Sequence, residues 1–174
     1  MSERAKEAGE LKGAPSATAA KHALYTEVRA RLDSLLEGEC DLVAMLSTIV
    51  CELHHSFEYF HWTGFYRARG EELFVGPYQG GHGCLRIAFS RGVCGAAART
   101  KTTQRHDNVH DAPDHIACSS STVSEIVVPV LSPAGDVLAV LDVDSDLGAA
   151  FCDVDHRELE AIAAMAGERW GRCS

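Results

Sequence analysis

The sequence lacks any apolar run of about 20 residues, the length that a helix needs to cross a bilayer. Its N-terminus also lacks the apolar segment of a secretory signal peptide. Positive charge is scarce, since 16 lysines and arginines stand against 25 aspartates and glutamates, for a formal net charge of −9. Surfaces that bind nucleic acid are basic. These absences predict a cytoplasmic protein with neither a membrane nor a nucleic acid as partner.

No internal repeat and no second domain boundary are visible in the 174 residues, a length that fits one domain. Residues 1–17 show no apolar periodicity, which predicts a flexible N-terminal tail ahead of a single domain over 18–174. Because 46% of the residues are hydrophobic, that domain can bury a substantial core.

The order of the expected elements indicates an α+β fold. Helical spacing predicts helices over 18–36 and from Asp41, and a third helix that closes the chain. Asp155 and Glu158 can cap the start of this last helix. Two-residue alternation predicts two pairs of strands. The first pair lies within 59–78, and the second is formed by 124–131 and 136–145. Between the pairs we expect a short strand, CLRIAF, and a short helix, GVCGAAART. Since hairpins join most strands, we expect an antiparallel sheet flanked by the N-terminal and C-terminal helices.

Cysteine is plentiful, with seven along the chain. In a reducing cytosol such a set indicates metal binding, redox catalysis or plain burial. Four of them border apolar helical patterns or lie in the C-terminal tail and are expected to have no catalytic role: Cys40, Cys51, Cys152 and Cys173. The other three, Cys84, Cys94 and Cys118, lie on glycine-rich or polar segments, where we expect their sulfur atoms to be accessible.

Zinc binding is one interpretation of these three thiols, because Cys and His are the usual zinc ligands. His82 lies two residues before Cys84, and His115 lies three residues before Cys118. Paired CxxC knuckles are lacking, and a domain with an ample core has no need of a structural metal. We therefore predict no metal and no other cofactor, with a Cys/His zinc site as an alternative.

Thiol redox chemistry is the second interpretation. Cys94 lies near the start of its expected helix, and a helix N-terminus lowers the pKa of a thiol. Cys118 lies in a polar loop near His115, which could stabilise a thiolate. Accessible thiols within reach of one another allow attack, sulfenic acid formation and closure of a disulfide. The plain alternative is a set of unreactive loop cysteines.

Carboxylates and aromatic residues predict a ligand pocket. In the segment DVLAVLDVDS, alternation puts Asp142 and Asp144 on one strand face, where an ionised carboxylate is costly unless it is paired. Glu125 opens the apolar strand EIVVPV, and Trp62 and Tyr66 share one face of an earlier strand. Together they could bind a small molecule that carries an ammonium group. The alternative is that the acids are solvated strand ends and the aromatics are core residues.

Five fragments of the sequence together resemble the free methionine-(R)-sulfoxide reductases, small cytosolic enzymes built on a single GAF domain. In chain order they are GPYQGGHGCLRI, SRGVCG, HIAC, SEIVVPV and LAVLDVDS. The likeness covers about residues 20–170 and is densest from Gly76 to Ser145. It implies a GAF-like antiparallel sheet flanked by N-terminal and C-terminal helices. The rival class is a GAF module that senses a small ligand without turnover, which would have no need of three thiols.

The resemblance also implies roles for particular residues. Cys84, Cys94 and Cys118 match the redox cysteines of the family. The residues that match those lining its methionine sulfoxide pocket are Trp62, Tyr66, Glu125, Asp142 and Asp144. We predict that Cys118 attacks and Cys84 resolves, with Cys94 as the other candidate participant.

The implied reaction reduces free L-methionine-(R)-S-oxide to L-methionine through a cysteine sulfenic acid and an intramolecular disulfide. A thioredoxin-type dithiol then restores the thiols, and the carboxylates supply a proton and bind the substrate ammonium. The sequence does not fix the oligomeric state and is compatible with a homodimer.

Overall fold

A computed structural model describes residues 17–111 and 121–172 of the chain, so most of the predicted tail 1–17 lies outside the described residues. Its elements in chain order are α1 (Ala17–Leu35), α2 (Leu42–Ser56), β1 (Trp62–Arg69), β2 (Glu72–Gln79), β3 (Arg86–Ala88), α3 (Gly92–Thr100), β4 (Gln104–His106), the 3-10 helix η1 (Val109–Asp111), β5 (Ser124–Leu131), β6 (Val137–Ser145) and α4 (Asp153–Trp170). The predicted α+β class is confirmed. The strand β4 was not predicted, because its sequence QRH is polar throughout, whereas the equally short β3 lies within the predicted apolar strand CLRIAF.

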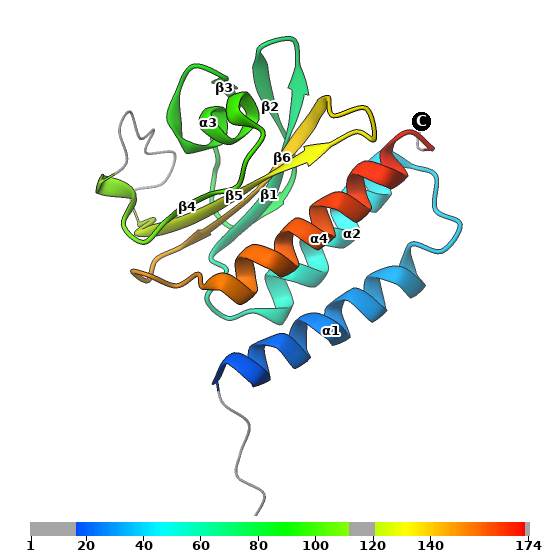
Figure 1. Cartoon of the computed structure of the whole chain (residues 1–174), viewed down its shortest axis with the longest axis horizontal. Coiled ribbons are helices and arrows are strands. Elements are labelled where there is room, and N and C mark those ends of the chain that lie inside the picture. Colours follow the sequence, from blue (N-terminus) through cyan, green and yellow to red (C-terminus); the bar gives the residue numbers. More distant parts are fainter. Residues whose placement is uncertain (1–16, 112–120, 173–174) are drawn as a thin grey trace, which may run out of the picture.

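One antiparallel sheet contains all six described strands, in the order β3-β2-β1-β6-β5-β4 (Figure 1). The hairpins β1–β2 and β5–β6 are the ones that the sequence predicts, and β6 pairs with β1 to join them. This pairing sets the register at the centre of the sheet. Trp62 lies opposite Asp144, and Glu125 lies opposite Asp144 from the other side.

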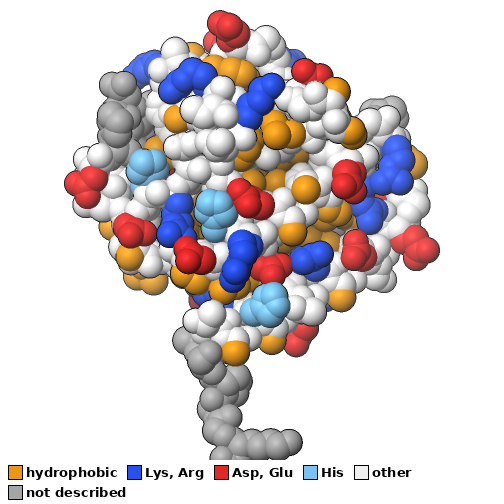
Figure 2. Space-filling view, viewed as in Figure 1, with side chains coloured by type: hydrophobic (Ala, Val, Ile, Leu, Met, Phe, Trp, Pro, Cys, Tyr) orange, Lys and Arg blue, Asp and Glu red, His pale blue; other side chains and the backbone are white. Residues whose placement is uncertain are grey.

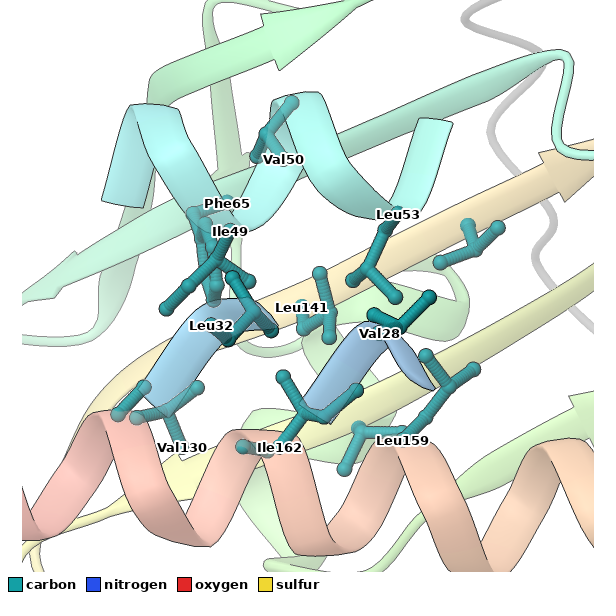
Figure 3. Close-up of a cluster of buried hydrophobic side chains, with 14 of the residues drawn as sticks. Val28, Leu32, Ile49, Val50, Leu53, Phe65, Val130, Leu141, Leu159 and Ile162 are labelled. Atoms are coloured by element: carbon teal, nitrogen blue, oxygen red, sulfur yellow. The ribbon is translucent and has the colours of Figure 1, made fainter. Parts of the chain in front are cut away.

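The main core lies between the sheet and the helices α1, α2 and α4, which all cover one face (Figure 1). Figure 3 shows Val28 and Leu32 of α1 beside Ile49 and Leu53 of α2, with Leu141 of β6 among them. Fully burying such a side chain contributes about 1.5–3 kcal/mol. On the outer surface, acidic and basic side chains are interspersed across the face shown in Figure 2.

A second, smaller core lies on the opposite face, beneath α3. The helix can approach the sheet edge closely because Gly95 has no side chain, since a Cβ there would lie 2.5 Å from the carbonyl oxygen of Ala88. The close approach places Val93 and Cys94 against the sheet, where they pack with Val127 and Val140.

Helix α4 begins with a cap that differs from the predicted one. The N-cap residue is Cys152, and Asp155 at the third helical position accepts a hydrogen bond from its backbone amide at 2.7 Å. Asp155 also accepts hydrogen bonds from the hydroxyls of Tyr25 and Tyr59. Glu158 lies one turn further on and forms an ion pair with Arg29 of α1.

No helix in the described part of the chain is long and apolar enough to cross a membrane.

Candidate functional site

The predicted pocket residues lie on the α3 face of the sheet, on three adjacent strands. The register puts Trp62 of β1, Asp144 of β6 and Glu125 of β5 in one row across the sheet. In the next row, Asp142 lies between Gly64 and Val127. Side chains that alternate with these residues along the strands enter the helical core instead. The structure thus brings together all five of the predicted pocket residues.

Trp62 and Tyr66 form an aromatic wall along β1. Their rings stack with centroids 5.6 Å apart, and Tyr78 of β2 stacks on the other side of Trp62 at 5.4 Å. Gly64 makes room for the indole, because a Cβ there would lie 2.5 Å from the Trp62 ring. Tyr78 was not among the predicted pocket residues, although its place in the densest matching fragment and its aromatic character could have indicated it.

The segment after β2 closes over this wall. The Trp62 indole N–H donates to the carbonyl oxygen of Gly81 at 3.1 Å, and the backbone amide of Cys84 donates to the Tyr66 hydroxyl. A Cβ at Gly83 would lie 2.8 Å from that hydroxyl oxygen, so only glycine allows the chain to run so close. Glycines in this segment therefore hold the backbone against the aromatic rings and bring Cys84 to the rim of the pocket.

Cys94 corrects one expectation. Its thiol was predicted to be accessible and acidic at a helix N-terminus, but its side chain is only 4% exposed, because α3 packs directly on the sheet. Its Sγ donates to Asp142 Oδ2 at 3.3 Å and lies 3.9 Å from Glu125 Oε1. Burial and the two neighbouring carboxylates raise the pKa of Cys94 well above its ordinary value. At neutral pH the group is a thiol, not a thiolate.

The carboxylates are buried, which excludes solvated strand ends for Glu125 and Asp142, whose exposed fractions are 6% and 5%. Burial raises the pKa of Asp142 to about 7, although its hydrogen bonds to Cys94 and Glu125 oppose the shift. Burial and the nearby Asp142 charge raise the pKa of Glu125 and Asp144 well above their usual range. Near neutrality this cluster therefore holds protons and can exchange them.

The remaining predicted cysteines differ in their state. Cys84 is half-buried against the smaller core and is disulfide-bonded. Of the other cysteines that the structure describes, Cys40, Cys51, Cys94 and Cys152 are free. Cys118 and His115 lie outside the described residues, so the predicted nucleophile has no described geometry.

Of the donors that the sequence offers for a zinc site, His115 and Cys118 lie outside the described residues. Cys84 is in a disulfide and offers no thiolate, while His82 is exposed. Ligand atoms of Cys94, Glu125 and Asp142 do lie within 4.8 Å of one another. Metal ligands must be deprotonated, however, and here the pKa values of all three groups are raised. Without a bound cation this cluster therefore holds protons, and it would have to release them to bind one.

Comparisons with known proteins agree with this geometry. Residues 41–168 match the family described as GAF domain. The chain is 34% identical to a free methionine-R-sulfoxide reductase of Escherichia coli, over 83% of this chain and 87% of that protein. It is 36% identical to one of Saccharomyces cerevisiae, over 83% and 84%. The structure of a free methionine-R-sulfoxide reductase from Neisseria meningitidis, in complex with its substrate, superimposes with a TM-score of 0.84 at 40% identity, covering 92% of this chain and 93% of that one.

Proposed function

The chain belongs to the free methionine-R-sulfoxide reductase family of GAF-domain proteins, and we propose that it reduces free L-methionine-(R)-S-oxide to L-methionine. The observation that carries the proposal is the row of groups across three strands. Trp62 offers an apolar wall, Asp144 and Glu125 follow it, and Cys84 lies at the rim in a disulfide. These are the groups that binding a sulfoxide with an ammonium group and reducing it through thiols would need.

The two ends of the substrate would bind to different groups of this row. A free amino acid carries an ammonium group, which an ionised Asp142 or Asp144 can bind through charge-assisted hydrogen bonds. The methyl sulfoxide end would lie against the aromatic wall of Trp62 and Tyr66. A methionine sulfoxide within a protein has an amide in place of the ammonium, so the buried carboxylates would be left unpaired and the substrate rejected.

The proton would come from a carboxylate whose pKa is raised. Glu125 is buried beside two other acids and therefore holds its proton at neutral pH. We propose that it donates to the sulfoxide oxygen, while Asp142, which ionises near pH 7, helps to bind the ammonium. Glu125 would thus carry the proton and its neighbours the charge. Different surroundings give neighbouring carboxyl groups different pKa values, so one can act as an acid while another is ionised.

The redox step would use two thiols. A thiolate attacks the sulfoxide sulfur, the oxygen is protonated and transferred, and methionine leaves with a sulfenic acid remaining on the enzyme. A second thiol attacks that sulfenic acid, which forms a disulfide and releases water. We propose Cys118 as the attacking thiol and Cys84 as the resolving one. The disulfide at Cys84 supports this, as does the protonated, buried state of Cys94, which makes it a poor nucleophile.

The activity is tested with the purified, reduced protein, a small dithiol and each epimer of free methionine sulfoxide. We expect the R epimer to be converted to methionine and the S epimer to be left nearly untouched. Equal turnover of both epimers would refute the assignment. Binding of the R epimer without any turnover would instead favour the ligand-sensing GAF module.

The thiol roles are tested by single substitutions. We expect Cys118→Ser to abolish sulfenic acid formation and Cys84→Ser to release about one methionine per enzyme before it stalls, because resolution needs the second thiol. Mass spectrometry of the protein and of released methionine measures both. Cys51→Ser, at an exposed free cysteine, is the matched control and should keep full turnover. A single turnover by Cys118→Ser would move the attacking role to Cys84 or Cys94.

Regeneration by a thioredoxin-type dithiol and assembly as a homodimer both remain predictions. A thioredoxin system that sustains turnover in place of the small dithiol would support the first. Light scattering during size-exclusion chromatography measures the second, because a dimer would have twice the mass of the chain.

A further inference from the structure

The edge of the sheet beside the disulfide has features that the proposed reaction does not use. Strand β3 is the last strand at this end, and it pairs only with β2 among the described strands. The chain enters β3 directly from Cys84 and Leu85, and the carbonyl of Leu85 already bonds to Val75 of β2. We call Cys84, Leu85 and Arg86 the Cys84 edge. The last strand at this end of the sheet thus begins two residues after a disulfide-bonded cysteine, with a bend at Leu85.

Leu85 projects into solvent on this edge. Its side chain is 76% exposed, the largest exposed fraction among the large hydrophobic side chains that the structure describes. Its neighbours along the chain behave differently, since Cys84 packs against the smaller core and Ile87 is buried in it. Burying a leucine contributes about 1.5–3 kcal/mol, and at Leu85 almost none of this is used for folding.

Two arginines flank the same edge. The guanidinium of Arg86 lies over the ring of Phe74 at 4.8 Å, and that of Arg69 lies over the same ring at 5.5 Å. Neither arginine forms an ion pair with an acidic group in the described part of the chain. Their positive charge is held in place by an aromatic ring on a chain whose formal charge is −9. The exposed Glu71 and Glu72 lie beside Arg69, so the positive charge of the edge is concentrated at Arg86, next to Leu85. An acidic group of a partner suits that position.

We propose that the Cys84 edge is the docking surface for a protein dithiol with an apolar face around its cysteine pair and an acidic group at the rim. This inference rests on the proposed function, because the disulfide must be reduced once in every cycle. A thiolate of the partner attacks the disulfide, which forms a mixed disulfide with one cysteine and releases the other. The second thiol of the partner then displaces that cysteine, so the partner leaves oxidised and the enzyme regains two thiols.

The apolar and charged parts of the surface have different consequences. Leu85 would be covered in the complex and should affect mainly the lifetime of the encounter. Arg86 and Arg69 should affect mainly the association rate, since charges at the rim of an interface guide encounter and lose effect as salt is added. A small dithiol such as dithiothreitol buries no such surface and needs neither.

The experiment compares thioredoxin with dithiothreitol as reductant for the wild-type chain, Leu85→Asp and Arg86→Glu. We expect kcat/KM for thioredoxin to fall about tenfold or more in Leu85→Asp, with turnover driven by dithiothreitol unchanged. Arg86→Glu should show a smaller loss that disappears at high salt. Leu35→Asp is the matched control, since Leu35 is 56% exposed at the end of α1, and it should behave as wild type with both reductants.

Undiminished turnover with thioredoxin in Leu85→Asp would overturn the docking surface, and so would an equal loss with both reductants. A second measurement separates this inference from the proposed function. Thioredoxin is mixed with the oxidised protein without any sulfoxide, and the reduction of the Cys84 disulfide is followed by mass spectrometry. Slow reduction in Leu85→Asp but not in Leu35→Asp supports docking even if methionine sulfoxide is not the substrate.

Discussion

At the scale of a single residue, burial favours the protonated form of Asp142, whereas binding an ammonium group needs its ionised form. It is 5% exposed, accepts the Cys94 thiol hydrogen and lies beside Glu125, and burial raises its pKa to about 7. A carboxylate that binds an ammonium must be ionised, yet ionisation in this place has no described cation to offset it. The substrate itself would supply the missing positive charge, which couples binding to proton release.

Replacing this residue tests the coupling. We expect Asp142→Asn to raise KM about tenfold or more, since roughly 1.5–3 kcal/mol of charged hydrogen bonding is lost. The same change should raise the melting temperature of the substrate-free protein at pH 8.5 by several degrees, because an amide has no charge to desolvate. Steady-state kinetics and calorimetry measure the two effects. Asp136→Asn, at an exposed position, is the control, and a loss of binding without a gain in stability would contradict the coupling.

At the scale of the element, β1 shapes the pocket because Gly64 has no side chain. Gly64 lets the Trp62 indole lie along the strand, and any side chain there would meet the indole and Tyr78. We expect Gly64→Ala to displace the aromatic wall and lower kcat/KM by about tenfold to a hundredfold, with the fold retained. Gly81→Ala is the control, since a Cβ there would meet nothing within 4 Å. Kinetics with the R epimer and the tryptophan fluorescence of each variant provide the test, and equal activities would contradict it.

Helix α4 depends on one carboxylate at its first turn. Burial would raise the pKa of Asp155, but hydrogen bonds from the Cys152 amide, Lys21 and Tyr59 outweigh burial and lower it. We expect Asp155→Asn to reduce the free energy of unfolding by about 2–4 kcal/mol, because buried donors lose a charged acceptor. Denaturant unfolding measures this. Asp153→Asn, at an exposed position of the same turn, should cost far less, and equal losses would assign the effect to the helix dipole instead.

The elements were more predictable than their contacts. Spacing of apolar residues located the helices and both hairpins, and it put Asp142 and Asp144 on one strand face. The nearness of Glu125 to Asp144 depends on the β5–β6 register, and the burial of Cys94 depends on how α3 packs. Both are long-range features that local periodicity does not contain. The sequence therefore named residues that the fold brings into one cluster, but the predicted accessible environment of Cys94 was wrong.

At the scale of the whole molecule, two groups of acids set the pH range of stability with opposite signs. The lowered pKa of Asp155 contributes stability above its unfolded value of about 3.9, and this is lost as the pH falls through the folded pKa. The raised pKa values of Glu125, Asp142 and Asp144 contribute stability that is complete below about pH 4 and is lost as the pH rises through their folded values, near 7 for Asp142.

We therefore expect the melting temperature of the substrate-free protein to be highest on the acid side of neutrality, between about pH 4 and 6. Calorimetry from pH 3 to pH 9 gives the profile. In Asp142→Asn the fall between pH 5 and pH 8 should become shallower, and in Asp155→Asn the fall below pH 4 should become shallower. A maximum above pH 8 in the wild-type protein would contradict the assignment of raised pKa values to the cluster.

The division of the sheet into two faces also bears on how such a chain can change over generations. The large core lies wholly on the helical face, whereas Cys84, Cys94 and the carboxylates around Asp142 lie on the other. Substitutions that abolish the chemistry therefore need not pass through an unfolded ancestor. A descendant that lost its cysteines would keep its scaffold, its aromatic wall and its carboxylates. Such a chain would be expected to bind a small ligand without turnover, which is the behaviour of the rival sensing module.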